Sequence, residues 1–309
     1  MGPAVASGLV QDGYDELGML ADNAAEAGLP WQGQPAVRRV ASELPDGRVI
    51  SALEWGEGPD ELVLLHGGAQ NAHTWDTVAL ALERPLLAVD LPGHGHSDWR
   101  PDHDYRPATL AEDVAVAITA LAPTARLVVG MSLGGLTAIH LAATRPDLVA
   151  DLALVDITPG VDDTKTGAIT EFVSGPERFG SFDEILQRTI AHNPGRSVSS
   201  LRRGVLHNAR PVPDGQWAWR WDPQRAMGRD GDGRLAFAAL WDDLATAPAP
   251  VLLVRGGRSP VVDDADVAEL RRRRPDAEVV VVDEAGHSVQ GDQPVELARI
   301  VAERMGAPA

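Results

Sequence analysis

The stretch Gly130-Met131-Ser132-Leu133-Gly134 decides the fold of this chain. It follows an apolar run and precedes a stretch with helical character. A Gly-x-Ser-x-Gly between a strand and a helix forms a turn so sharp that side chains two residues before and after the serine would collide. Glycine at those two positions removes the clash and lifts the serine hydroxyl clear of the sheet. The pattern predicts a nucleophilic serine; a glycine-rich turn without chemistry is the alternative.

Three other motifs also come directly after apolar runs. They are His66-Gly67-Gly68 after residues 61–65, Asp90-Leu91-Pro92-Gly93-His94-Gly95-His96-Ser97 after residues 85–89, and Glu284-Ala285-Gly286-His287 after residues 278–282. A single motif of this kind is a weak signal, because glycine and serine are common in loops. Four motifs in this order, each at a position where a strand is expected to end, together give a specific signal.

This order of motifs resembles the α/β-hydrolase superfamily over about residues 37–305. The short, β-branched runs that alternate with helical stretches are typical of strands covered on both faces. The resemblance implies an α/β-hydrolase fold, with a mostly parallel eight-stranded sheet, helices on both faces and a cap inserted after the sixth strand. The expected strands are 37–44, 48–55, 61–65, 86–90, 127–131, 149–156, 251–255 and 279–282, and the expected helices are 14–27, 108–121, 135–144 and one that begins near 264.

The chain is expected to have three parts. Residues 1–35 form an N-terminal extension outside the superfamily pattern, which we expect to pack on the surface; a dimer contact or a flap near the site is the alternative. Residues 36–158 and 246–309 form the core. Residues 159–245, where the alternation of strands and helices breaks, form the cap, or lid.

The composition limits the partners of the chain. Its 309 residues carry 45 acidic and 27 basic side chains, a formal net charge of −18, which repels nucleic acid and anionic membranes. Cysteine is absent, which excludes disulfides and thiolate chemistry. No secretory leader or bilayer-spanning segment is evident, so we expect a cytoplasmic protein. No zinc or dinucleotide motif occurs, and we expect neither a metal nor a cofactor.

The serine needs a base and a site for the oxyanion. An imidazole titrates in the right range to take the hydroxyl proton, and His287 lies where the resemblance places the catalytic histidine. Fixed backbone donors stabilise the oxyanion. The N–H of Leu133, directly after the serine, is one donor. The superfamily pattern implies Gly68 as the second, with Ala69 as the alternative.

The acid departs from the usual superfamily pattern. A carboxylate normally follows the seventh strand as Gly-x-x-Asp, but Ser259 occupies that position in residues 256–260. Asp156 ends the sixth strand, beside the nucleophile strand, and can reach the histidine from there. The rival carboxylates, two of which also suit the cap of a helix, are Asp263, Asp264 and Asp283.

The combination of Ser132, Asp156, Ser259 and His287 resembles a branch of esterases in this superfamily that have a Ser-Asp-Ser-His arrangement. In that branch the acid follows the sixth strand and a second serine takes the vacated position. The resemblance implies that the Ser259 hydroxyl holds His287 or Asp156 by a hydrogen bond. A turn serine before a proline is the alternative.

Three tryptophans of the expected cap, Trp217, Trp219 and Trp221, alternate with other residues. This spacing places them on one face of an extended segment. They either pack the cap on the core or form an aromatic wall of an acyl or ring pocket.

The motifs together predict acyl transfer in two steps. Ser132 attacks, an acyl-enzyme forms, and water activated by His287 releases the acid. We expect a carboxylic ester hydrolase, an esterase or lactonase, acting on a small or medium apolar ester or lactone. A thioesterase or a C–C bond hydrolase would use the same machinery. A hydrolase-fold small-molecule receptor with little turnover is the alternative from another functional class. The sequence also allows a homodimer.

Overall fold

The computed structural model describes residues 14–223 and 237–306. Residues 1–13 of the expected extension and residues 224–236 of the expected cap lie outside the described residues. In the described part of the chain, no helix combines the length and the apolar character needed to cross a membrane.

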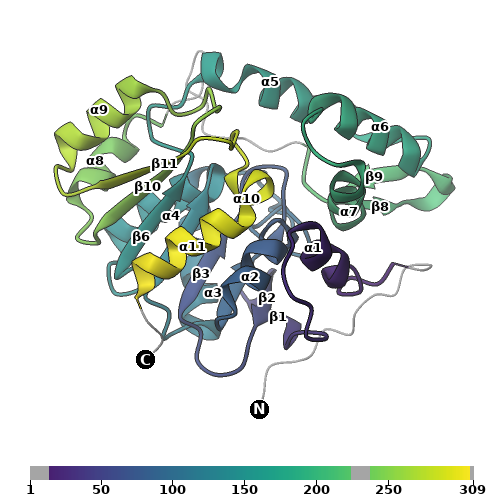
Figure 1. The fold of residues 1–309 in the computed structure, drawn as a ribbon, viewed down its shortest axis with the longest axis horizontal. Coiled ribbons are helices and arrows are strands. Elements are labelled where there is room, and N and C mark those ends of the chain that lie inside the picture. The colour runs from purple at the N-terminus through teal and green to yellow at the C-terminus, as the bar shows by residue number, and fades with distance from the viewer. Residues whose placement is uncertain (1–13, 224–236, 307–309) are drawn as a thin grey trace.

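An eight-stranded sheet forms the centre of the molecule (Figure 1). Its strand order is β1-β2-β4-β3-β5-β6-β10-β11. The pairs β1–β2 and β2–β4 are antiparallel, whereas all other neighbours run parallel, which confirms the predicted fold class. The strands are β1 (Val37–Glu43), β2 (Val49–Trp55), β3 (Leu62–Leu65), β4 (Leu86–Val89), β5 (Leu127–Met131), β6 (Asp151–Val155), β10 (Val251–Gly256) and β11 (Glu278–Val282).

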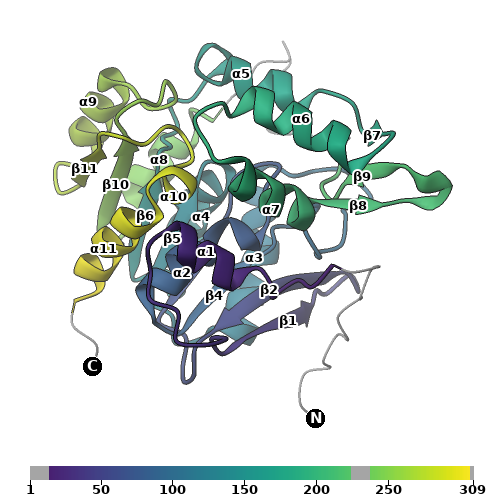
Figure 2. The ribbon, with the colours of Figure 1, turned by 45° about the vertical axis from the view of Figure 1, so that its right-hand side comes forward.

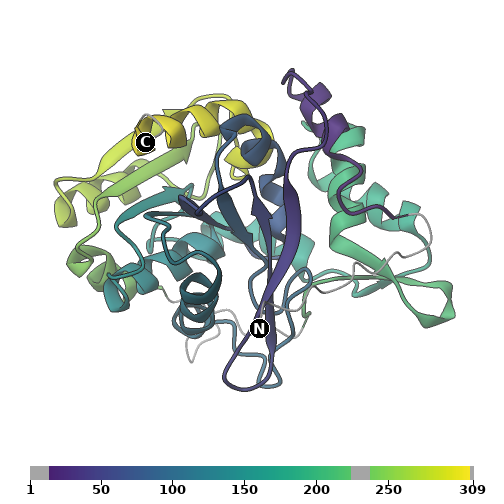
Figure 3. The ribbon, with the colours of Figure 1, turned by 90° about the horizontal axis from the view of Figure 1, so that it is seen from below.

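Helices cover both faces of this sheet, as Figure 3 shows from below. β5 shows the cause, because successive side chains of a strand point to opposite faces. Val128 belongs to one buried apolar cluster, while Leu127 and Val129 belong to the other. The first cluster includes side chains from α3 (Pro107–Leu121), α4 (Leu133–Thr144), α8 (Leu240–Thr246) and α9 (Asp264–Arg273). The second includes side chains from α1 (Leu20–Glu26), η1 (Ala72–Trp75), α2 (Asp76–Leu82), α10 (Val289–Asp292) and α11 (Pro294–Met305).

The described residues between β6 and α8 form a further group of elements beside the main sheet (Figure 2). Three short strands pair there in the order β7-β9-β8. Phe179 and Trp219 of this insertion form an apolar cluster with Ala69, which lies in the loop after β3. The elements are α5 (Asp163–Val173), β7 (Arg178–Phe179), α6 (Phe182–His192), α7 (Val198–Asn208), β8 (Ala209–Pro211), η2 (Pro213–Gly215) and β9 (Trp217–Trp219).

The helix predicted for residues 14–27 is shorter than expected. α1 begins at Leu20, so the prediction is wrong for residues 14–19. The Tyr14 hydroxyl lies 2.7 Å from Nδ1 of His207, and Glu16 accepts a hydrogen bond from Arg39 at 2.9 Å. These distant contacts fix the segment in a conformation that local helix propensity does not determine.

Candidate active site

Ser132 lies in the turn between β5 and α4, with φ 50° and ψ −118°. A positive φ is uncommon for a residue other than glycine and marks local strain. A Cβ at Gly130 would lie 2.5 Å from the carbonyl oxygen of Gly134, and one at Gly134 would lie 2.3 Å from that of Leu65. These close approaches are the physical reason for both glycines. The turn therefore has the geometry that the pentapeptide predicted.

Asp156 follows β6 and is fully buried. Its Oδ2 lies 2.8 Å from Nδ1 of His287, which comes from the loop between β11 and α10. Its Oδ1 accepts the N–H of Gly256 at 2.9 Å, and Oδ2 also accepts the Ser259 hydroxyl. The structure thus brings together the acid, the histidine and the second serine that the sequence singled out.

Ser259 bonds to the acid rather than to the histidine. Its oxygen accepts the Val261 N–H at 3.1 Å, so its own proton is free to reach Asp156. The serine is therefore a turn residue and a partner of the carboxylate at once. Both interpretations of this residue describe part of its environment.

The rival carboxylates lie in other environments. Asp263 caps α9 by accepting the Asp266 N–H at 2.9 Å, in a capping box. Asp264 is exposed and accepts a hydrogen bond from Arg255 at 2.6 Å. Asp283 is exposed at the end of β11. The geometry favours Asp156 as the group that orients the histidine.

The expected oxyanion donors lie near the serine. Leu133 is the first residue of α4, and the first N–H groups of a helix have no acceptor within it. Gly68 and Ala69 lie in the loop after β3, and both line the same cavity as Ser132 and Leu133. Ala69 has φ 62°, so this loop also holds a residue in the left-handed region.

His66 orders the start of this loop. Its Nδ1 lies 2.7 Å from the carbonyl oxygen of Gly67, and its Nε2 accepts the Leu91 N–H at 2.9 Å. Burial lowers the pKa of His66, which keeps the ring neutral. Through these contacts His66 connects the loop after β3 to the loop after β4.

A cavity of about 1210 Å³ adjoins Ser132 and His287. The core, the insertion and the N-terminal helix all contribute to its wall. The apolar lining residues from the core and the insertion include Leu136, Ile157, Ile169, Phe172, Val173, Trp219 and Trp221. The N-terminal helix and its end add the polar Asn23, the acidic Glu26 and the small Ala27. Such a mixed cavity has room for an acyl chain and an alcohol.

Two of the three tryptophans line this cavity. Trp219 and Trp221 stack with ring centroids 4.2 Å apart, and both belong to the lining. Trp217 instead packs edge-on against Phe182, at 5.2 Å between centroids. The spacing of the three residues gave no means to separate these environments.

Sequence reasoning missed a buried polar cluster near the loop after β3, which carries Gly68 and is called the oxyanion loop below. His73 bonds through Nδ1 to Asp76 at 2.9 Å, and its ring stacks on His207 at 3.7 Å between centroids. The His-x-x-Asp spacing within one helical turn is a signal that could have pointed to the first pair. Nothing local in the sequence links it to His207.

The two rings of this cluster have opposite pKa shifts. Burial favours the neutral ring of His73, but the charge and hydrogen bond of Asp76 outweigh it and raise its pKa to about 9. Burial and the charge of His73 hold the pKa of His207 well below its usual value. At neutral pH one imidazole is charged and its neighbour is not.

Comparisons with known proteins agree with the fold. The model of the α/β-hydrolase fold family matches residues 61–294. The chain is 49% identical over 296 residues to the esterase Rv0045c of Mycobacterium tuberculosis, which covers 94% of this chain and 95% of that protein. It is 33% identical to the pimeloyl-[acyl-carrier protein] methyl ester esterase of Aeromonas salmonicida, over 82% of this chain and 97% of the relative. A structure of the M. tuberculosis esterase, solved in work on its inhibition by transition metals, has a TM-score of 0.82 at 48% identity and covers 94% of this chain and 98% of that one.

Proposed function

The chain belongs to the α/β-hydrolase family, and we propose that it hydrolyses carboxylic esters through an acyl-enzyme on Ser132. One observation carries this proposal above the others. Asp156 is bonded to His287, which lines the same cavity as Ser132 in its strained turn. The two similar proteins named above are both esterases, which supports the choice of ester over other acyl compounds.

Asp156 orients the base. An ionised carboxylate only accepts hydrogen bonds, so Nδ1 of His287 carries the proton that faces it. Nε2 of the same ring is then the unprotonated nitrogen, suited to take the proton of the Ser132 hydroxyl. As the ring becomes an imidazolium, the carboxylate stabilises its charge. Ser259 and the Gly256 N–H hold the carboxylate in place.

The backbone N–H donors and His287 together account for both steps of the proposed reaction. Ser132 attacks the ester carbonyl, and the N–H groups of Leu133 and Gly68 stabilise the oxyanion that forms. His287 gives its proton to the departing alcohol, and the same ring activates water to release the acid. Loss of one oxyanion donor typically costs about 2.7–4 kcal/mol of transition-state stabilisation.

The substrate is a small or medium apolar ester or lactone. The cavity volume of about 1210 Å³ and the stacked Trp219 and Trp221 in its wall support an apolar acyl group. The insertion, residues 159–245, acts as the cap that shapes this pocket. The net charge of −18 supports a small-molecule substrate over nucleic acid or an anionic membrane surface.

Hydrolysis of p-nitrophenyl acetate, butyrate and octanoate tests this proposal. Wild type is expected to turn over at least one of these esters, with a preference that reports the acyl length that fits the cavity. Ser132→Ala is expected to lose this turnover and to keep its fold by circular dichroism. Equal turnover by the two proteins would refute the serine mechanism. A ligand that binds tightly without turnover would favour a receptor instead.

A further inference from the structure

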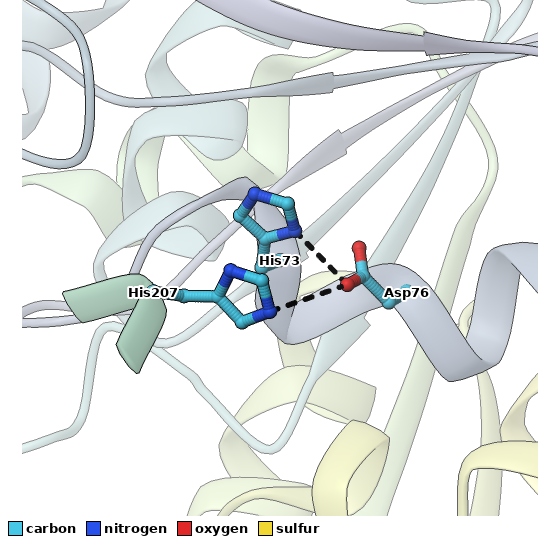
Figure 4. Close-up of side chains that lie close together, drawn as sticks. All are labelled: His73, Asp76 and His207. Carbon is cyan, nitrogen blue, oxygen red and sulfur yellow. Dashed lines mark hydrogen bonds and ion pairs between the residues drawn. The ribbon is translucent and has the colours of Figure 1, made fainter. Parts of the chain in front are cut away.

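Three side chains with metal-binding groups meet at a junction outside the proposed catalytic residues. His73 lies on η1, Asp76 is the first residue of α2, and His207 lies on α7 of the insertion. Figure 4 shows that both rings turn one nitrogen toward the same oxygen of Asp76. The core and the insertion therefore each supply a ligand type that transition metals prefer.

The spacing of these atoms suits a small divalent ion. Nδ1 of His73 lies 2.9 Å from Oδ2 of Asp76, and Nε2 of His207 lies 3.9 Å from the same oxygen. Bonds of 2.0–2.1 Å in a tetrahedral zinc site place neighbouring ligand atoms about 3.3 Å apart, between these two distances. The two rings stack, so binding requires one ring to turn until a nitrogen of each faces the ion. Binding also displaces the proton that His73 holds in the ion-free cluster, because only a neutral imidazole binds a metal.

The cluster contains buried polar atoms without partners. Nε2 of His207 and Oδ1 of Asp76 have no hydrogen-bond partner among residues 14–223 and 237–306. The side chains of His207 and Asp76 are 5% and 2% exposed. A buried polar atom normally finds a partner, because leaving one unsatisfied costs its full desolvation free energy. The free nitrogen of His207 points toward Asp76 (Figure 4), where an ion would satisfy it.

The second nitrogen of each histidine ring, on the side away from Asp76, also has a polar partner. Nε2 of His73 lies 3.1 Å from Glu16, and Nδ1 of His207 lies 2.7 Å from the hydroxyl of Tyr14. Histidines that bind metals almost always engage the other ring nitrogen in a hydrogen bond, which fixes the ring and the tautomer. The N-terminal extension supplies both of these outer partners, so three parts of the chain meet at the cluster.

We propose that His73, Asp76 and His207 bind a divalent transition-metal ion such as Zn²⁺, with water as the fourth ligand. The bound ion fastens α7 of the insertion to η1 and α2 of the core. Asn71 lies two residues before His73, and Asn208 directly follows His207; a hydrogen bond of 3.1 Å between their side chains already joins the same two parts. The site goes beyond ester hydrolysis and does not depend on it.

Metal titration of the full chain, prepared without an affinity tag and freed of metal by a chelator, tests the site. Calorimetry with Zn²⁺ is expected to show one tight site in wild type, and Co²⁺ is expected to give the visible absorption of a tetrahedral complex. Asp76→Asn and His207→Gln are each expected to weaken Zn²⁺ binding at least tenfold. His140→Gln is the matched control, because His140 also pairs with an aspartate, Asp243 at 2.7 Å, away from the cluster.

Thermal unfolding supplies the second readout. Zn²⁺ is expected to raise the unfolding temperature of wild type and His140→Gln, because an ion that binds only the folded state stabilises it, and to leave Asp76→Asn unchanged. If that variant does not fold, Tyr14→Phe keeps all three ligands and is expected to bind Zn²⁺ about 10- to 100-fold more weakly. Absence of Zn²⁺ binding in wild type, or equal affinity in wild type and a folded ligand or Tyr14 variant, would overturn the proposal and leave a purely structural polar cluster.

Discussion

At the scale of single residues, the position of the acid is the informative feature. Asp156 accepts hydrogen bonds from His287, Ser259 and the backbone of Gly256 while it is shielded from water. A buried carboxylate is costly unless such partners surround it. The serine at position 259 is therefore explained by the displaced acid, since its hydroxyl occupies one side of that carboxylate.

Replacement of the acid tests its role. Asp156→Asn keeps the size of the side chain but removes the charge that selects the tautomer of His287 and stabilises the imidazolium. We expect the turnover of a p-nitrophenyl ester to fall by roughly 10⁴-fold, with the circular dichroism spectrum unchanged.

Asp263→Asn is the control for this change. Asp263 caps α9 and lies outside the hydrogen bonds of Asp156. Asparagine is an equally good N-cap, so Asp263→Asn should change the stability little and keep its turnover. Turnover of Asp156→Asn within tenfold of wild type would contradict the assignment of the acid.

Residues whose identity is fixed by the local backbone geometry were predictable from sequence. Gly130 and Gly134 surround Ser132 because a side chain at either position would strike backbone. Gly135 was not recognised, although a Cβ there would lie 2.4 Å from Cγ2 of Ile157. That contact depends on how α4 packs against the chain after β6, which the sequence pattern does not contain.

At the scale of elements, α7 is coupled to the oxyanion loop. Nδ2 of Asn208, the last residue of α7, donates to the carbonyl oxygen of Ala69 at 2.6 Å. Asn71, two residues further along this loop, donates to the carbonyl oxygen of His207 at 3.1 Å. Ala69 has a positive φ, so these bonds hold a strained part of the loop. The insertion thus helps to set the loop that carries Gly68.

Loss of this contact is expected to affect the chemical step. Asn208→Ala should lower kcat about tenfold and change KM little, because the oxyanion donor loses its positioning while the cavity walls remain. Asn193→Ala is the matched control. Asn193 also lines the cavity, but its side chain donates to the carbonyl oxygen of Thr189, one turn back at its own helix end, at 3.0 Å. A fall in kcat of the same size in both variants, or a change confined to KM, would contradict the coupling.

Elements were predictable where local pattern and burial agree. β5 has the predicted bounds, since a short apolar run in a covered sheet has one preferred state. The N-terminal helix was predicted too long, because Tyr14 and Glu16 bond to distant residues. The different environments of Trp217 and Trp219 also depend on packing within the insertion, which periodicity alone does not specify.

At the scale of the whole molecule, the order of motifs was enough to predict the sheet and its two helical layers. It was not enough to place the N-terminal extension. Leu20 of α1 is buried with the second apolar cluster, and Arg203 of α7 donates to Asn23 at 2.6 Å. The extension therefore joins the core to the insertion beside the cavity. Such contacts between distant segments have no signature in a single sequence.

One buried carboxyl is expected to reduce the stability of the whole fold at alkaline pH. Burial and the nearby charge of Glu54 raise the pKa of Asp60 to about 7. The folded state therefore holds a proton that the unfolded chain releases near pH 4, so the cost of this group to stability grows between about pH 4 and pH 7 and reaches its full value above the folded pKa. Asp60→Asn should raise the unfolding temperature, and by more at pH 8.5 than at pH 5.

Differential scanning fluorimetry at the two pH values measures this effect. Glu57→Gln is the control, because Glu57 lies in the same loop but is exposed, and it should show no such pH-dependent gain. An equal shift for Asp60→Asn at both pH values, or destabilisation at pH 8.5, would contradict the ionisation argument.

The central claim is that Ser132 forms the covalent intermediate, and a p-nitrophenyl alkylphosphonate tests it most directly. This reagent transfers its phosphonyl group to an activated serine and leaves it there. We predict release of one p-nitrophenol per chain and an adduct, located by mass spectrometry, on the peptide that contains Ser132. Ser132→Ala should show neither. An adduct on another residue, or labelling of Ser132→Ala to the same extent, would contradict the account.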